Sequence, residues 1–141
     1  NIERFPEEVV VRNDLIILRF DAQLFFGNIE FFKKLVLEAI EKNKGQVKGF
    51  IINARAINYI DSTATEQLVE IIKKLQKKDI RVMIVGAIGP ARDLIIKSKL
   101  IKVLGKENLF ITSGDASDSF DGICKKTSLQ KKLSRQSNLN I

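Results

Sequence analysis

Apolar and polar positions alternate along this chain with two periods, one of two residues and one close to 3.6. Short runs of aliphatic and aromatic residues predict strands, because successive side chains of a strand point to opposite faces of a sheet. The runs are Val9–Val11, Leu15–Phe20, Phe50–Ile52, Val82–Val85 and Leu109–Ile111. The first two are separated by Arg12-Asn13-Asp14. Because an Asn-Asp pair favours a tight turn, we expect these two strands to pair antiparallel.

Four stretches with helical spacing alternate with these runs. Asn28 begins the first helix, and Gly45 is its stop signal. Pro90 fits the first turn of the third helix, and Ser113 or Asp115 caps the fourth. The apolar stripes are Phe32, Leu35, Val36, Ala39 and Ile40 in the first helix, Ala64, Leu68, Ile71, Ile72 and Leu75 in the second, Leu94 and Ile95 in the third, and Ala116, Phe120, Ile123 and Cys124 in the fourth.

The resulting order, β-β-α-β-α-β-α-β-α, is typical of a sheet whose parallel strands are covered by helices. The chain has 141 residues, the size of one domain, and no internal repeat or linker divides it. We therefore expect an α/β fold with a mixed, mostly parallel sheet of about five strands and four helices. The domain would occupy residues 1–124, and residues 125–141 would form a basic polar tail.

Most of the net charge of +7 belongs to that tail. Residues 122–141 hold five bases and no acid: Lys125, Lys126, Lys131, Lys132 and Arg135. The rest of the chain carries 19 bases against 17 acids. Nucleic-acid binders carry a basic stripe on the folded body, so we expect no nucleic-acid partner. Two interpretations of the tail stay open: it lies against anionic lipid, or it is a solvated end of the chain.

The sequence lacks residues that several kinds of catalytic, metal and nucleotide site require. The chain has no histidine, and its single cysteine, Cys124, shares a predicted helix stripe with apolar residues, where core packing explains it. Neither G-x-x-x-x-G-K-[ST] nor G-x-G-x-x-G occurs, and Gly86 and Gly89 near Pro90 are interpreted as a strand-to-helix turn. We expect no catalytic residue, no metal and no cofactor, and hence a protein that is not an enzyme.

We expect the chain to be a piece of a longer protein. No run approaches the ~18 apolar residues of a membrane-spanning helix. The chain begins with Asn1, and no signal-peptide pattern follows it. A lone cysteine fits a reducing compartment.

The segment Asn58–Glu66 is the most distinctive in the sequence. It opens the second predicted helix with three oxygen-bearing side chains in a row, Asp61, Ser62 and Thr63. One interpretation is a T-x-x-E capping box formed by Thr63 and Glu66. The other is an anion or phosphorylation site at Asp61, Ser62 and Thr63, because helix N-termini attract negative groups.

Two passages carry a resemblance to a known family. Residues 60–64, Ile-Asp-Ser-Thr-Ala, are similar to the D-S-[ST]-[GA] signature of STAS domains, with Ala64 where anti-sigma factor antagonists usually have glycine. Residues 19–32, Arg-Phe-Asp-Ala-Gln-Leu-Phe-Phe-Gly-Asn-Ile-Glu-Phe-Phe, resemble the passage that opens the STAS domain of SulP-type anion transporters. The antagonists generally lack this aromatic passage. The resemblance covers residues 6–124 and implies the fold expected above.

The resemblance implies a non-catalytic domain that helps a sulfate or related anion transporter to fold, assemble and be regulated. It would lie on the cytoplasmic side of the membrane, with the transporter's membrane domain as partner and preceding Asn1. The resemblance leaves two further partners open, a second copy of the chain and a regulatory protein. Core filling is favoured for Phe32, whereas Phe25, Phe26 and Phe31 are candidates for a docking surface.

The alternative implied by the same family is a soluble anti-sigma factor antagonist. In those proteins the serine directly after the motif aspartate is phosphorylated by a partner kinase, and this position is Ser62 here. Such a protein would be a phosphorylation-switched binding protein rather than part of a transporter.

Overall fold

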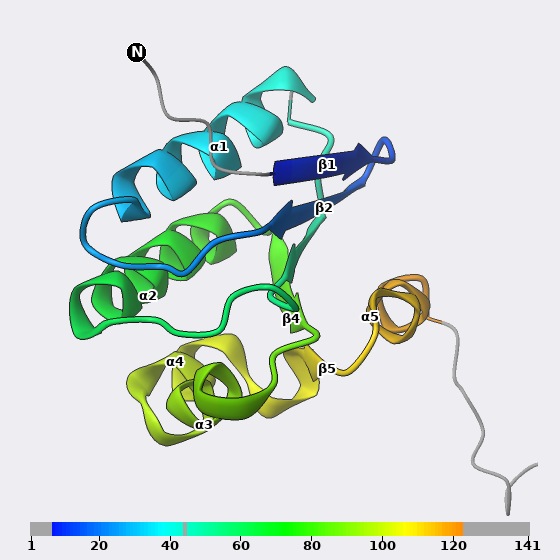
Figure 1. The fold of residues 1–141 in the computed structure, drawn as a ribbon. Helices are drawn as coiled ribbons and strands as arrows, with labels where there is room; N and C mark the ends of the chain where they lie inside the picture. The colour runs from blue at the N-terminus through cyan, green and yellow to red at the C-terminus, as the bar shows by residue number, and fades with distance from the viewer. Residues whose placement is uncertain (1–6, 44, 123–141) are drawn as a thin grey trace, which may run out of the picture.

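The computed structural model describes residues 7–43 and 45–122, which form one sheet with helices on both faces (Figure 1). The tail at residues 125–141 and Cys124 lie outside the described residues, so the expectations for them stay predictions. The strands follow the order β1-β2-β3-β4-β5 across the sheet. They are β1 (Glu7–Val11), β2 (Leu15–Phe20), β3 (Gly49–Asn53), β4 (Arg81–Val85) and β5 (Leu109–Phe110).

The sheet is mixed and mostly parallel. Strand β1 pairs antiparallel with β2, whereas β2 to β5 pair parallel. The expected count of about five strands therefore holds only when the antiparallel strand is included, since the parallel part has four. All four parallel strands end at the same edge of the sheet, and the loops that follow them share this edge.

Five α-helices lie within the described residues, so the expected four helices are one too few. They are α1 (Ile29–Lys42), α2 (Ser62–Lys77), α3 (Gly89–Lys97), α4 (Lys99–Leu104) and α5 (Ser113–Phe120), with a 3-10 turn, η1, at Lys106–Asn108. The additional helix arises at Ser98, whose extended backbone ends α3 and whose Oγ caps α4 by accepting from Leu100 N–H (3.2 Å). None of the described helices is long and apolar enough to span a bilayer.

The larger core lies between the sheet and helices α1 to α4. Phe20, Phe32 and Phe50 are fully buried there, and the Phe20 and Phe32 rings meet edge to face at 5.2 Å. This confirms Phe32 as a core residue. Helices α1 and α2 lie side by side, and both begin at the left of the view in Figure 1.

Helix α5 covers the other face of the sheet, where Ile51 and Met83 are buried with Ala116. An ion-pair cluster attaches this helix to the β1–β2 turn: Arg12 Nη2 lies 2.6 Å from Asp121 Oδ1, and Arg12 Nε lies 2.7 Å from Asp14 Oδ1. The cap of α5 is Thr112, whose Oγ1 accepts from Asp115 N–H (3.1 Å). The expectation that Ser113 or Asp115 caps this helix is therefore wrong, because Ser113 is already the first residue of the helix and the residue before it is the cap.

Candidate functional site

The candidate site begins at the N-terminus of α2, which Asp61 caps. Asp61 has extended backbone angles (φ −76°, ψ 172°), and its Oδ1 accepts from Ala64 N–H (2.7 Å). The capping box predicted at Thr63 and Glu66 is wrong, because the helix begins at Ser62 and Thr63 already lies inside its first turn. The capping role belongs to the aspartate of the predicted motif.

Asp61 also binds the loop that joins β2 to α1. Its second carboxylate oxygen, Oδ2, accepts from Phe26 N–H (3.0 Å), and its own N–H donates to the carbonyl of Leu24 (3.0 Å). Leu24 N–H in turn donates to the carbonyl of Tyr59 (3.1 Å), so the two loops run parallel for a short distance. One carboxylate therefore fixes both the helix start and the aromatic loop.

Asn28 clamps the same aromatic loop from inside. Its side chain is fully buried, accepts from Phe25 N–H (2.9 Å) and donates from Nδ2 to the carbonyl of Gln23 (2.6 Å). These bonds satisfy the polar groups of an otherwise costly buried amide. Sequence reasoning placed Asn28 at the helix start and missed this role, because the role depends on the path of residues 23–28.

The clamped loop presents two phenylalanines to solvent. Phe26 is 72% exposed and Phe25 is 38% exposed, and their rings meet edge to face at 5.9 Å. The Phe25 ring packs over Gly27, where an added Cβ would lie 2.5 Å from Phe25 Cε2. Phe31 is half-buried against the core, so we leave it out of the proposed surface.

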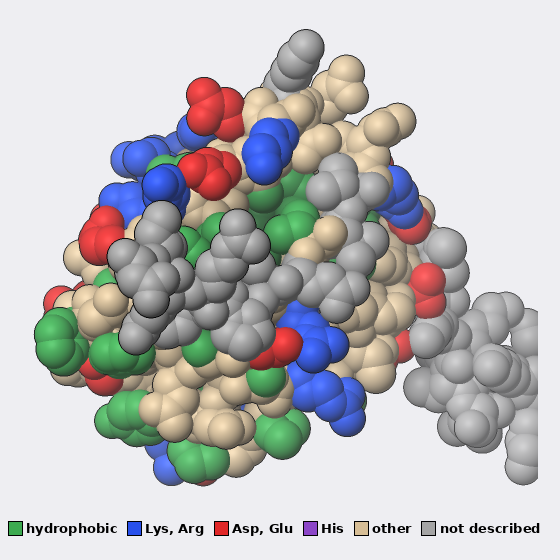
Figure 2. Space-filling model, turned by 45° about the horizontal axis from the view of Figure 1, so that its top comes forward, with side chains coloured by type: hydrophobic (Ala, Val, Ile, Leu, Met, Phe, Trp, Pro, Cys, Tyr) green, Lys and Arg blue, Asp and Glu red, His purple; other side chains and the backbone are tan. Residues whose placement is uncertain are grey.

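Tyr59, from the neighbouring loop, is 50% exposed and was missed by sequence reasoning, although its aromatic side chain directly before the motif was a signal. We call Phe25, Phe26 and Tyr59 the aromatic rim. Figure 2 shows several hydrophobic side chains gathered at the left and lower left of the molecule, the side from which α1 and α2 begin in Figure 1. Exposed aromatic side chains held in place by polar bonds are typical of an interaction surface.

Ser62 and Thr63 lie beside the rim. Both are exposed, and neither hydroxyl makes a hydrogen bond within the described residues. Their position brings Ser62, Thr63 and Asp61 together at one helix start, as the sequence predicted. Asp61 presents both carboxylate oxygens to backbone N–H groups, so this helix start is already occupied by a negative group.

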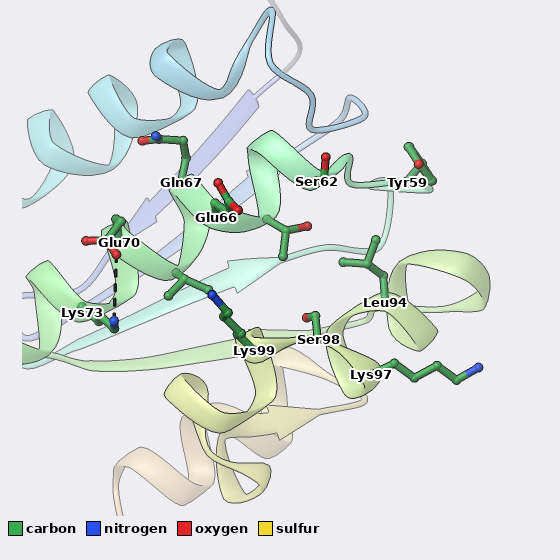
Figure 3. A pocket seen from close by; sticks show the side chains of 12 residues that line it. Tyr59, Ser62, Glu66, Gln67, Glu70, Lys73, Leu94, Lys97, Ser98 and Lys99 are labelled. Carbon is green, nitrogen blue, oxygen red and sulfur yellow. Dashed lines mark ion pairs between the residues drawn. The ribbon is translucent and has the colours of Figure 1, made fainter.

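A groove of about 770 Å³ runs from Ser62 and Tyr59 along α2, with α3 and α4 as its other wall (Figure 3). Glu66 and Glu70 line the α2 wall, and Lys99 projects into the groove from the opposite wall. Val69 and Leu94 contribute apolar side chains to its lining. The groove therefore has acidic side chains on its α2 wall and a basic side chain on the opposite wall.

Near the rim, Arg19 Nε lies 2.8 Å from Asp21 Oδ1. The hydrogen bonds from Arg19 hold the pKa of the Asp21 carboxyl below its ordinary value, and the charge of Arg19 acts in the same direction. Asp21 therefore stays ionised beside the start of the aromatic loop.

Comparison with known proteins identifies the family. The model of the STAS domain matches residues 7–116 of this chain. Sulfate transporter 4.1 of Arabidopsis thaliana is 29% identical over 125 residues, which cover 82% of this chain and 18% of that protein. A probable sulfate transporter of Mycobacterium tuberculosis is 27% identical over 120 residues, which cover 85% of this chain and 21% of that protein. The chain thus spans about a fifth of the length of these relatives.

Solved structures share the fold. A sulfate transporter family protein from Wolinella succinogenes superimposes with a TM-score of 0.69 at 24% identity, covering 81% of this chain and 90% of that one. The STAS domain of a SulP transporter from Vibrio cholerae gives 0.64 at 21% identity, covering 81% and 86%. The anti-sigma factor antagonist SpoIIAA gives 0.65 at 20% identity, covering 86% and 100%. With the family model matching most of its length, the chain belongs to the STAS domain family.

Proposed function

We propose that this chain is the regulatory and assembly domain of a SulP-type sulfate or related anion transporter, and that it catalyses no reaction. The sulfate transporters among its relatives support this assignment, because their similarity to the chain extends over most of its length. The domain would lie at the cytoplasmic side of the membrane and contact the membrane domain of the same transporter.

The observation that carries the proposal is the aromatic rim. The chain buries Asn28 completely and uses one carboxylate oxygen of Asp61, Oδ2, to hold a loop whose outermost ring, Phe26, is 72% exposed. Exposing this apolar surface does not stabilise an isolated domain, whereas burying it against a partner contributes favourable free energy to docking. The rim would pack on the membrane domain.

The test is anion uptake by the full parent protein with Phe26→Ser, which removes the ring and leaves the loop bonds to backbone N–H groups intact. Uptake or surface abundance should fall several-fold. Val9→Ser is the matched control, because Val9 is also exposed, at 41%, but lies on β1 away from the rim. Wild-type uptake at wild-type abundance with Phe26→Ser would refute docking through the rim.

The second candidate is an anti-sigma factor antagonist switched by phosphorylation of Ser62. The observation that favours it is the exposed Ser62 hydroxyl, which the helix does not use as a cap. A phosphate there would add about −1.5 to −2 charges close to the Asp61 carboxylate, and so would change partner binding.

Ser62→Asp and Ser62→Ala should both keep the thermal midpoint of the chain nearly unchanged, because Asp61 supplies the cap. The substitutions should alter transport or binding to another domain. If neither substitution changes stability, transport or binding, Ser62 has no regulatory role. If both unfold the chain, Ser62 is structural.

A further inference from the structure

A second group of exposed aliphatic side chains lies near the carboxyl ends of β4 and β5, at the same edge of the sheet as the aromatic rim. Ile88 is 60% exposed, Ile96 is 44% exposed and Ile111 is 74% exposed. We call these three residues the isoleucine corner. The aromatic rim follows β2 and β3, whereas Ile88 and Ile111 follow β4 and β5 and Ile96 lies in α3, so neither surface is a part of the other.

Backbone pairing brings two members of the corner, Ile88 and Ile111, together. Val85 pairs with Phe110, and Gly86 N–H donates to the carbonyl of Phe110 (3.1 Å), so Ile111 leaves β5 beside the turn that carries Ile88. Gly86 and Gly89 have positive φ angles of 74° and 56°, which a side chain at either position would strain. This turn holds Ile88 at the N-cap of α3, where an apolar side chain contributes no capping bond.

Basic side chains surround the isoleucine corner. Arg92 and Ile96 are four residues apart within α3, a spacing that places them on one side of the helix, and Ile88 precedes the helix as its N-cap. The Cβ of Arg55 lies 3.2 Å from the Cβ position of Gly86. Lys97 points away from α2 in Figure 3.

None of these three bases forms an ion pair within the described residues. Asp93 is the acid of α3 and follows Arg92 directly, so it projects about 100° further round the helix. The corner therefore combines aliphatic side chains with an excess of unpaired positive charge.

We propose that the isoleucine corner with Arg55, Arg92 and Lys97 contacts an anionic lipid surface. Aliphatic side chains enter the boundary between headgroups and acyl chains, and neighbouring bases bind the negative headgroups. The rim and the corner lie at one edge of the sheet, so a domain docked through the rim would present the corner to adjacent lipid. The inference goes beyond the proposed function and does not require it, because it concerns the affinity of this chain for lipid.

The first experiment exploits the absence of tryptophan from the chain. Ile88→Trp and Ile111→Trp each introduce a single reporter at the corner, and Val9→Trp introduces one on β1. With vesicles of phosphatidylcholine and phosphatidylserine, fluorescence of the first two should shift to the blue and be quenched by brominated acyl chains. Fluorescence of the third should not change. Unshifted emission from both corner reporters would overturn the proposal.

The second experiment measures flotation with the same vesicles. Each base removed should weaken binding about five-fold at low salt, so Arg55→Gln with Arg92→Gln should lose most of it. Lys74→Gln with Lys77→Gln is the matched control, since both lysines are exposed near the C-terminus of α2, at the other edge of the sheet. Vesicles of phosphatidylcholine alone should bind the wild-type chain weakly.

A full-length variant with the five tail bases changed to glutamine separates the corner from residues 125–141. Vesicle binding by this variant should still weaken when Arg55 and Arg92 are changed to glutamine. Equal binding by the corner variant and the control variant would overturn the proposal. Polyglutamate, an acidic soluble polymer, is a further comparison. If polyglutamate binds the corner and anionic vesicles do not, the proposal is also overturned, because the partner would then be an acidic protein surface.

Discussion

At the scale of single residues, Asp61 does the most to build the candidate site. Its carboxylate caps α2 through Ala64 N–H and holds the aromatic loop through Phe26 N–H. Removing it leaves two backbone donors without their partner, one of them at a helix start.

We therefore expect Asp61→Ala to lower the free energy of unfolding by about 1–2 kcal/mol, the range of a lost N-cap with a second lost hydrogen bond. Urea unfolding measures the change. Thr63→Ala is the control and should change stability by no more than ~0.5 kcal/mol, because the Thr63 side chain is exposed and makes no bond. An equal loss from both substitutions would contradict the role assigned to Asp61.

The sequence located this site but misassigned roles within it. The run Asp61-Ser62-Thr63 predicted a helix start, which the structure confirms. The choice of Thr63 as cap was wrong because the cap is the last residue with extended backbone angles, a property that sequence patterns place only to within a residue or two. The clamp at Asn28 was not predictable, because its partners Gln23 and Phe25 are defined by the loop path.

At the scale of elements, α5 is held to the β1–β2 turn by Arg12. Hydrogen bonds from Arg12 lower the pKa values of the Asp121 and Asp14 carboxyls, and those carboxylates raise the pKa of Arg12. The Arg12 guanidinium also lies over the Phe120 ring, 5.6 Å from its centre. These charged groups are exposed to solvent, so salt screens their attraction.

This cluster predicts a pH dependence. The folded-state pKa values of both carboxyls lie below the ordinary value of 3.8. Their contribution to stability is therefore complete above that value and is lost as the pH falls through the folded-state pKa values. Urea midpoints between pH 7 and pH 2 should fall less steeply at the acid end in Arg12→Gln than in wild type. Parallel curves would show that the cluster does not stabilise the fold.

Most elements were predictable, and the exceptions have local causes. The strands agree with the apolar runs to within two residues, because β2, β3 and β4 are buried on at least one face and require apolar side chains there. The break between α3 and α4 was missed, since Ser98 is neither glycine nor proline and its capping bond is formed only in the fold. The predicted last helix ends at Phe120, before the positive φ of Gly122.

At the scale of the whole molecule, the exposed apolar side chains are unevenly distributed. Phe25, Phe26 and Tyr59 follow β2 and β3, and Ile88 and Ile111 follow β4 and β5, so one edge of the sheet carries most of the exposed large hydrophobic residues among those described. This arrangement was not predictable from spacing, because the five residues come from four separate loops. It gives the domain one edge suited to contact with a partner.

The most direct test of docking replaces Phe26 with the photo-reactive residue p-benzoylphenylalanine in the full parent protein, within its own membrane. Illumination should cross-link position 26 to the membrane domain. The same residue at Lys77, which lies exposed at the end of α2, should give no such cross-link. Cross-links to the membrane domain from position 77 and none from position 26 would contradict the account.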